Sequence, residues 1–407
     1  MNRRLLFLLL PVILCTVLSE TVQSVASITQ PETIVSSGVI EYSPAGPERI
    51  EKRICAYVSF NDSTASFVAS HFDLVIADLD TVTIDQIKTL NPDIIILGYR
   101  DVMAMHTYYS DWAEVNSHED WFLHDVNGSR LIRNSWGWYA MDVGNSGWRS
   151  HYAEYVKNKL QSHPFDGVFA DDVWETLPAG DGWNPWTVPI QNVPVEIKQR
   201  WYNDMLGMIR FVKESIGGKL LIVNTSNNGD FVNACDGKNE EEFVHPSWYA
   251  PDDFSDAYIR WKDKVDSLKN ISQSGKYYLA SSGTVIPDNP TQADLEKAHG
   301  IMTYCLASYL LGVKGGNGNF GFNDINSKDG SRGYYSEFDV PLGYPINDYY
   351  SIGNIYARDF LNGKVLVNPT LSSSTLLLEE NFKTLDGQVV SNITLGSHSG
   401  IILLRAG

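Results

Sequence analysis

Short β-rich runs alternate with longer helical patterns along most of this 407-residue chain, and this alternation constrains its fold more than any other feature. Repeated strand–helix units build a parallel sheet covered by helices, the architecture of α/β proteins. Candidate strands lie at residues 54–60, 74–77, 94–99, 167–171, 220–224, 235–243, 277–281 and 313–320, the sixth being the weakest. Eight such runs predict a closed barrel.

Helical spacing of apolar residues predicts five helices between and after these strands. They span residues 148–162, 195–216, 254–274, 292–311 and 347–361. Beyond Asn362-Gly363 the pattern changes to alternating strands at residues 365–367, 374–378, 389–395 and 400–404, separated by turn residues. We therefore expect a barrel over residues 51–361 and a small all-β, sandwich-like C-terminal domain over residues 362–407.

The N-terminus has the pattern of a targeting segment. Arg3 and Arg4 precede an apolar run at residues 5–18, and small residues follow up to Ala26. We expect a signal peptide over residues 1–26, with an uncleaved membrane anchor as the alternative. Residues 27–50, rich in Ser, Pro and Gly, are expected to form a linker or arm. The protein is thus predicted to be secreted or held at the cell surface.

The charge and the cysteine content exclude several classes of partner. A net charge of −18 repels phosphate backbones and anionic lipids, so nucleic acid and membrane surfaces are not expected partners. After cleavage Cys55, Cys235 and Cys305 would remain, a number and spacing that fit neither a disulfide framework nor a zinc site. No His-x-His or His-Glu-x-x-His motif occurs, and we expect no metal and no cofactor.

The fourth candidate strand ends in paired carboxylates. Its apolar run opens with Asp166-Gly167 and closes with Asp171 and Asp172. Carboxylates just past the C-terminal end of a buried parallel strand stand where α/β barrels place their active sites. The alternative is that Asp172 caps the next helix. Asp171 is therefore the stronger catalytic candidate, and Asp172 is a candidate for substrate binding.

A second acidic segment, at residues 235–243, repeats this arrangement. The offset from Asp236 to Glu241 equals that from Asp166 to Asp171, so two strand ends are predicted to present carboxylates to one mouth. Adjacent strand residues point to opposite faces, and the sequence leaves Glu241 and Glu242 as alternatives. A solvated acidic loop would account for the same segment.

Two carboxylates across a cleft suit the cleavage of glycosidic bonds, with one acting as general acid and the other as nucleophile or base. Aromatic residues make up 12% of the chain, and flat rings near the strand ends suit the C–H faces of sugars. Arg100 follows the third strand, where it either binds ligand or forms a structural ion pair. The candidates for substrate binding are Asp172, Trp174, Tyr99, Arg100, Trp138, Asn224, Glu242 and Trp248.

Three segments carry a resemblance to a known family. They are residues 120–128 (DWFLHDVNG), 141–149 (MDVGNSGWR) and 166–173 (DGVFADDV), and the similarity continues to residues 358–369 (RDFLNGKVLVNP). Together they resemble glycosyl-hydrolase-like family fifteen and, more distantly, the α-1,4-polygalactosaminidase-type barrels. The resemblance implies a (β/α)8 TIM barrel with a C-terminal β domain, exported and acting on polysaccharide. It matches Asp171 and Glu241 to the two catalytic acids.

The prediction is therefore a secreted glycoside hydrolase with Asp171 as nucleophile or base and Glu241 as general acid, roles that can be exchanged. Retention or inversion stays open because it depends on the separation of the carboxylates. Two other classes stay open as well. One is a non-catalytic carbohydrate-binding or cell-surface protein. The other is a metal-dependent hydrolase or lyase that uses Asp171, Asp172 and Glu175 as oxygen ligands.

Overall fold

The structure is a computed structural model that describes residues 49–51, 53–55, 62–79, 83–133, 137–177, 192–254, 257–323 and 333–407. The predicted signal peptide, the predicted arm up to residue 48 and residues 56–60 of the first expected strand lie outside the described residues. The described residues all belong to one compact unit.

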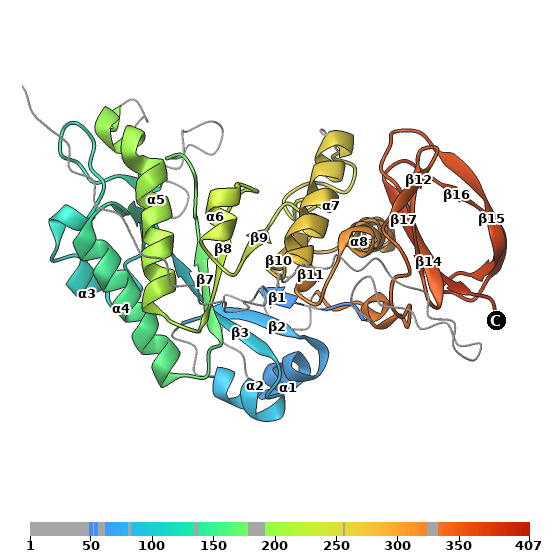
Figure 1. The fold of residues 1–407 in the computed structure, drawn as a ribbon, viewed down its shortest axis with the longest axis horizontal. Helices are drawn as coiled ribbons and strands as arrows, with labels where there is room; N and C mark the ends of the chain where they lie inside the picture. Colours follow the sequence, from blue (N-terminus) through green and yellow to red (C-terminus); the bar gives the residue numbers. More distant parts are fainter. Residues whose placement is uncertain are drawn as a thin grey trace, which may run out of the picture. The chain divides into compact units, whose positions relative to one another are not determined.

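A parallel sheet forms the centre of this unit (Figure 1). In the described part of the chain it has eight strands, which lie side by side in the order in which they occur along the sequence. They are β1 (Arg53–Cys55), β2 (Leu74–Asp78), β3 (Ile95–Asp101), β7 (Gly167–Asp171), β8 (Leu220–Asn224), β9 (Gly237–Glu240), β10 (Tyr277–Ser282) and β11 (Gly318–Phe322). The sheet curls, and the amide of Phe320 in β11 donates to the carbonyl oxygen of Glu51 beside β1 at 2.9 Å.

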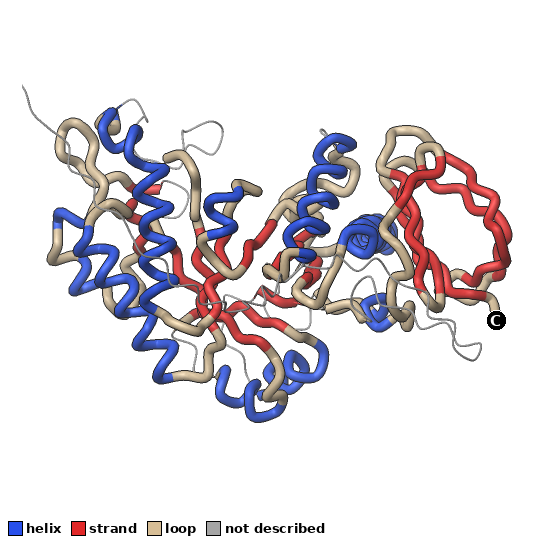
Figure 2. The backbone as a smooth tube through the Cα atoms, in the orientation of Figure 1, coloured by secondary structure: helices blue, strands red, loops and turns tan. Residues whose placement is uncertain are grey.

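Helices lie between consecutive strands of the sheet along the chain, as Figure 2 shows. They are α1 (Asp62–His71), α2 (Ile84–Leu90), α4 (Ser146–Ser162), α5 (Val195–Ser215), α6 (Gly229–Asn233), α7 (Ala257–Gln273) and α8 (Gln292–Gly312). The prediction of helices at α4, α5, α7 and α8 is confirmed. The shorter α1, α2 and α6 were not predicted, because a short helix gives only a few apolar positions at helical spacing.

The two faces of the sheet bury separate apolar clusters. The inner face holds Leu74, Ile76, Leu97, Tyr99, Phe169, Ile222 and Leu279, whereas two larger clusters fill the space between the outer face and the helices. Side chains alternate between faces along a strand, so counting by twos from Leu97 puts Asp101 on the inner face. The same count from Phe169 puts Asp171 there. Both carboxylates therefore sit at the end of an apolar inner core.

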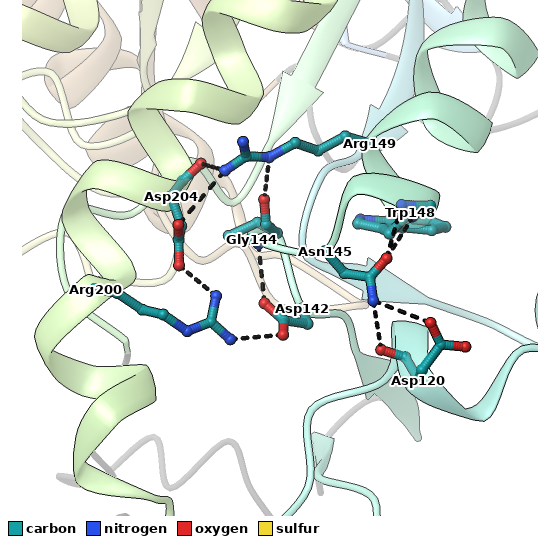
Figure 3. A network of polar contacts seen from close by, with 10 residues as sticks. Asp120, Asp142, Gly144, Asn145, Trp148, Arg149, Arg200 and Asp204 are labelled. Atoms are coloured by element: carbon teal, nitrogen blue, oxygen red, sulfur yellow. Dashed lines mark hydrogen bonds and ion pairs between the residues drawn. The ribbon is translucent and has the colours of Figure 1, made fainter.

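A polar network joins the N-terminal half of α4 to α5 (Figure 3). The side chain of Asn145 caps α4 by accepting hydrogen bonds from two amides of its first turn. Arg149 on α4 donates to the carbonyl oxygen of Asp204 on α5 at 2.6 Å, and Arg200 binds Asp142 at 2.6 Å. These contacts fix the helix that follows the loop region leading out of β3.

That loop region contains a small antiparallel sheet that the sequence did not reveal. Its strands are β4 (Ala104–Met105), β5 (Ile132–Arg133) and β6 (Trp138–Ala140), in the order β4-β6-β5, and the segment also contains α3 (Trp112–Val115) and η1 (Glu119–Trp121). Strands this short carry too few residues to show an alternating pattern. This loop region brings Arg133 to the end of β7, where it contacts Asp172.

The C-terminal part is all-β, as predicted, and its six strands form one antiparallel sheet that begins earlier than expected. Its strands are β12 (Tyr350–Ile352), β13 (Ile355–Phe360), β14 (Gly363–Asn368), β15 (Ser374–Lys383), β16 (Val389–Leu395) and β17 (Ser399–Arg405), and η4 (Ser336–Asp339) precedes them. The expected helix at residues 347–361 is therefore wrong. Ile352 pairs with Ile355 across Gly353, whose φ of 59° suits a two-residue hairpin turn.

Arg358 connects this sheet to the parallel sheet's helices. It lies on β13 and is 1% exposed, and its Nη1 donates to the carbonyl oxygens of Leu310 and Val313 at the end of α8, at 2.8 and 2.7 Å. Burial lowers the pKa of Arg358 to about 10. The guanidinium thus satisfies carbonyl groups that a helix C-terminus leaves without intrahelical donors.

We expect Arg358→Met to lower the free energy of unfolding by about 3 kcal/mol, because the buried carbonyl groups at the end of α8 lose their donor. Chemical denaturation of the full chain measures this loss. The matched control is Arg405→Met on β17, whose half-exposed side chain pairs with Glu380 and should contribute less than about 1 kcal/mol. Equal losses in the two variants would contradict the assignment.

Candidate active site

Three carboxylates meet where β3 and β7 end. Asp101 and Asp171 are register partners on these neighbouring strands, and Asp172 follows directly. One oxygen of each lies within 4.8 Å of the others, and within the described residues no other group of three or more potential metal-binding side chains is this close. Parallel strands bring their C-terminal ends to one edge of the sheet, which is why residues far apart in sequence converge here.

Three donors hold the Asp171 carboxylate. The hydroxyl of Tyr99 donates to Oδ2 at 2.8 Å, and Nδ2 of Asn224 donates to Oδ1 at 2.8 Å. The backbone amide of Asp172 also donates to Oδ1, at 2.8 Å. Tyr99 and Asn224 come from the strands on either side of β7, so the carboxylate is fixed from both neighbours. The structure thus brings together three of the residues that the sequence singled out.

Asp172 is 7% exposed and has a φ of 54°, in the left-handed region. A residue other than glycine pays about 1–3 kcal/mol for such a conformation, which persists only where surrounding contacts impose it. Arg133 makes such a contact with Asp172, since its Nη1 lies 2.6 Å from Oδ2 of Asp172. Burial and the charge of Asp171 raise the pKa of Asp172 to about 6, although Arg133 opposes the shift.

Asp101 completes the cluster and was missed by the sequence analysis, which ended the third strand at Tyr99. Its side chain is completely buried, and its Oδ1 accepts from the amides of Met103 and Ala104 at 2.9 and 2.7 Å. Burial and the charges of Asp172 and Asp171 raise its pKa well above the usual range. A polar residue directly after an apolar strand was the available signal, the same one that identified Asp171.

The three glutamates at and after the end of β9 have different surroundings. Glu240, the last residue of β9, is buried and pairs with Lys238 at 2.9 Å and with Lys264 of α7 at 2.6 Å. Glu242 pairs with Arg260, also on α7. Glu241 stands between them in the turn after β9 and is half-buried.

Two predicted substrate-binding residues are not brought to the carboxylate cluster. Arg100 is 2% exposed on the outer face, where it pairs with Asp111 at 2.8 Å and lies over the rings of Tyr109 and Tyr155. This is the structural ion pair that the sequence left open. Glu242 pairs with Arg260 of α7. In both cases the neighbouring helix or loop supplied a counter-charge that the local sequence does not show.

The remaining aromatic candidates differ in their surroundings. Trp174 is half-buried, with the guanidinium of Arg133 over its ring at 5.5 Å. Trp138 is half-buried on β6, next to His106, and Trp248 is 41% exposed in the loop after β9. Trp174 is thus tied to the carboxylate cluster through Arg133.

The cluster's donor set suits protons better than a hard cation. Calcium takes six to eight oxygen ligands, whereas here Arg133 occupies Asp172 and three hydrogen bonds occupy Asp171. Glu175, the third ligand in the metal-dependent alternative, instead binds Ser226 and Asn228.

Among the described residues, no helix combines the length and the apolar character that crossing a bilayer requires.

Comparison with known proteins gives one family match. The model of hypothetical glycosyl hydrolase family 15 matches residues 88–364, more than half of the chain. No curated protein matches the chain in sequence.

Several solved structures are distantly similar. The glycoside hydrolase domain of PelA from Pseudomonas aeruginosa is 14% identical over 67% of this chain and 93% of that one, with a TM-score of 0.45. Ega3 from Aspergillus fumigatus, in complex with galactosamine, is 12% identical over 70% and 94%, with a TM-score of 0.43. The maltogenic α-amylase AmyB from Thermotoga neapolitana is 13% identical over 87% and 98%, with a TM-score of 0.49.

We expect Arg133→Gln to make stability fall more steeply with rising pH. The pKa of Asp172 is raised by folding to about 6, so the folded state binds more protons than the unfolded state and loses stability as pH rises from about 4 through 6. Without Arg133 the ionised form loses its counter-charge. The variant should therefore lose about 1–3 kcal/mol relative to wild type at pH 8 and less at pH 5.5, measured by urea denaturation.

Lys314→Gln is the control, because Lys314 pairs with Asp348 at 2.6 Å. Burial opposes the ionisation of Asp348, but Lys269 and Lys314 outweigh burial and lower its pKa to about 2. Asp348 is therefore ionised throughout the window, and the stability that this variant loses should not change between pH 5.5 and 8. A pH-independent loss in Arg133→Gln would show that Arg133 does not stabilise an ionised Asp172.

Proposed function

Because the chain belongs to hypothetical glycosyl hydrolase family 15, we propose that it is a secreted enzyme that cleaves the glycosidic bonds of a polysaccharide with a pair of carboxylates. The observation that carries the proposal is the convergence of Asp171 and its three donors at the end of β7. Glu241, the residue directly after β9, is the proposed partner, as the resemblance to the family implies.

The proposed chemistry assigns complementary roles to the two carboxylates. Asp171 acts as nucleophile or base, because its orientation is fixed by Tyr99, Asn224 and the backbone. Glu241 acts as general acid and protonates the leaving oxygen, while the transition state develops oxocarbenium character. The roles can be exchanged without changing the residues. A carboxylate held in place accelerates the reaction because it is already oriented toward the reacting atoms when substrate binds.

We also propose that the curled sheet closes into a (β/α)8 barrel with the site at its C-terminal mouth. Eight parallel strands in sequential order and the hydrogen bond between Phe320 and Glu51 support this closure. In barrels of this kind the loops after the strands carry the chemistry. The cluster of Asp101, Asp171 and Asp172 follows that rule.

The proposed ligand is a neutral or amino-sugar polymer. A net charge of −18 disfavours acidic polysaccharides, and the exposed indole of Trp248 together with Trp174 and Trp138 offers flat apolar surface for sugar rings. Export through the N-terminal segment, over residues 1–26, would bring the enzyme to such polymers outside the cell. The C-terminal antiparallel sheet belongs to the same compact unit as the site.

We expect Asp171→Asn and Glu241→Gln each to lower the release of reducing ends by about 100-fold or more, since each removes one acid–base or nucleophilic group. The measurement uses the mature wild type and variants on a panel of neutral, amino and acidic polysaccharides. Glu242→Gln is the matched control, one residue away and paired with Arg260, and should stay within a few-fold of wild type. Retained sugar binding with no release by wild type would instead indicate a carbohydrate-binding protein.

A further inference from the structure

The carboxyls of Asp101 and Asp172 form a pair that the two-carboxylate mechanism does not use. One oxygen of each carboxyl lies within 4.8 Å of the other. Both are almost inaccessible to solvent, with exposures of 0% and 7%. Two buried carboxyls this close together require a compensating group, because like charges at short range are costly where water is excluded.

The geometry around Asp101 shows where a proton belongs. Oδ1 already accepts from the amides of Met103 and Ala104. Oδ2 is buried and has no donor among the described residues. As a carboxylate oxygen it could only accept, and the adjacent Asp172 carboxylate has no proton to give. A proton on Oδ2 turns this atom into a donor and Asp172 into its acceptor, which satisfies both groups at once.

We propose that Asp101 is a positioning residue: it shares a proton with Asp172, and the shared proton keeps Asp172 in the conformation in which its backbone amide holds Asp171. The chain of contacts is continuous. The Asp101 carboxyl lies beside that of Asp172, Arg133 contacts Oδ2 of Asp172 at 2.6 Å, and the Asp172 amide donates to Oδ1 of Asp171 at 2.8 Å. The effect on catalysis rests on the proposed function, whereas the proton pair itself does not.

The shared proton also sets the charge beside Asp171. With it, the pair carries one negative charge, which Arg133 balances. Without it, a second negative charge would face Asp171 in a site closed to water, and Asp101 would repel Asp172 from its left-handed conformation. The charged and titratable groups that face the pair are Asp171 on β7, Arg133 on β5, Tyr108 and Tyr109 in the loop after β4, and Tyr152 on α4.

The direction of the pH effect follows from this arrangement. Folding raises the pKa of both members, through burial and then through their neighbours' negative charges. Stability contributed by the protonated pair is present at low pH and is lost as pH rises from about 4 through the pKa values of the folded pair. Activity should fall over the same upper range, because Asp172 then releases its hold on Asp171.

The test compares Asp101→Asn and Asp101→Ala in the full chain. Asparagine reproduces the neutral acid: its oxygen accepts from the Met103 and Ala104 amides, and its amide donates to Asp172 at every pH. We expect Asp101→Asn to retain activity within about threefold of wild type at pH 6 and to lose the alkaline decline of kcat. Asp101→Ala should lose about tenfold or more, because three groups lose their partner.

Unfolding measured from pH 4 to pH 8 provides a readout that needs no substrate. Relative to wild type, Asp101→Asn should gain stability as pH rises. The matched control is Asp125→Asn, a second buried aspartate. Hydrogen bonds from the amides of Ser129 and Asn127 lower its pKa. That variant should be destabilised by a constant amount above pH 5, since it replaces a carboxylate that is ionised there.

Two results would overturn the proposal. One is a folded Asp101→Asn variant as inactive as Asp101→Ala, which would mean that the site needs an ionised Asp101. The other is an Asp101→Asn variant whose free energy of unfolding changes with pH in the same way as that of wild type. If wild type cleaves no polysaccharide, the proposed function fails, and the unfolding comparison still decides whether the pair shares a proton.

Discussion

The parallel ladder between β3 and β7 is the constraint on which the rest of the site depends. Because Asp101 pairs in register with Asp171, and because side chains alternate between faces, both carboxylates end on the inner face above an apolar core. A shift of one residue in this register would turn Asp171 toward the helices. The donors Tyr99 and Asn224 reach Asp171 for the same reason, since they share that face on the adjacent strands.

Buried charge in this protein is accommodated by three different means. Arg358 finds backbone carbonyl groups at the end of α8, and Arg100 finds an ionised Asp111. The carboxyls of Asp101 and Asp172 have too few donors, and a proton is the group that completes them. In each case a buried charge without a partner would be costly. The neighbouring groups therefore decide whether the buried group binds carbonyl oxygens, forms an ion pair or keeps a proton.

How far the sequence predicts this protein can be argued from particular elements. The strand that ends at Asp171 was predictable because a continuous apolar run between turn residues is typical of a buried parallel strand. The segment at residues 347–361 was assigned to a helix, although its Gly-Asn pair marked the hairpin between β12 and β13. There a plausible apolar spacing hid a turn signal. Asp101 is not predicted because the apolar run ends at Tyr99, two residues before the end of β3.

The sequence by itself determined the order of the parallel strands and of the longer helices α4, α5, α7 and α8, the family, and the strand end that carries Asp171, because these follow from local patterns of apolar, turn and acidic residues. Tertiary structure alone decided which neighbours those residues have. Arg133 reaches Asp172 from a loop region 39 residues earlier, and Arg260 of α7 pairs with Glu242. Such contacts join segments that are distant in the chain, and only the packing of the strands and helices brings them within hydrogen-bonding distance.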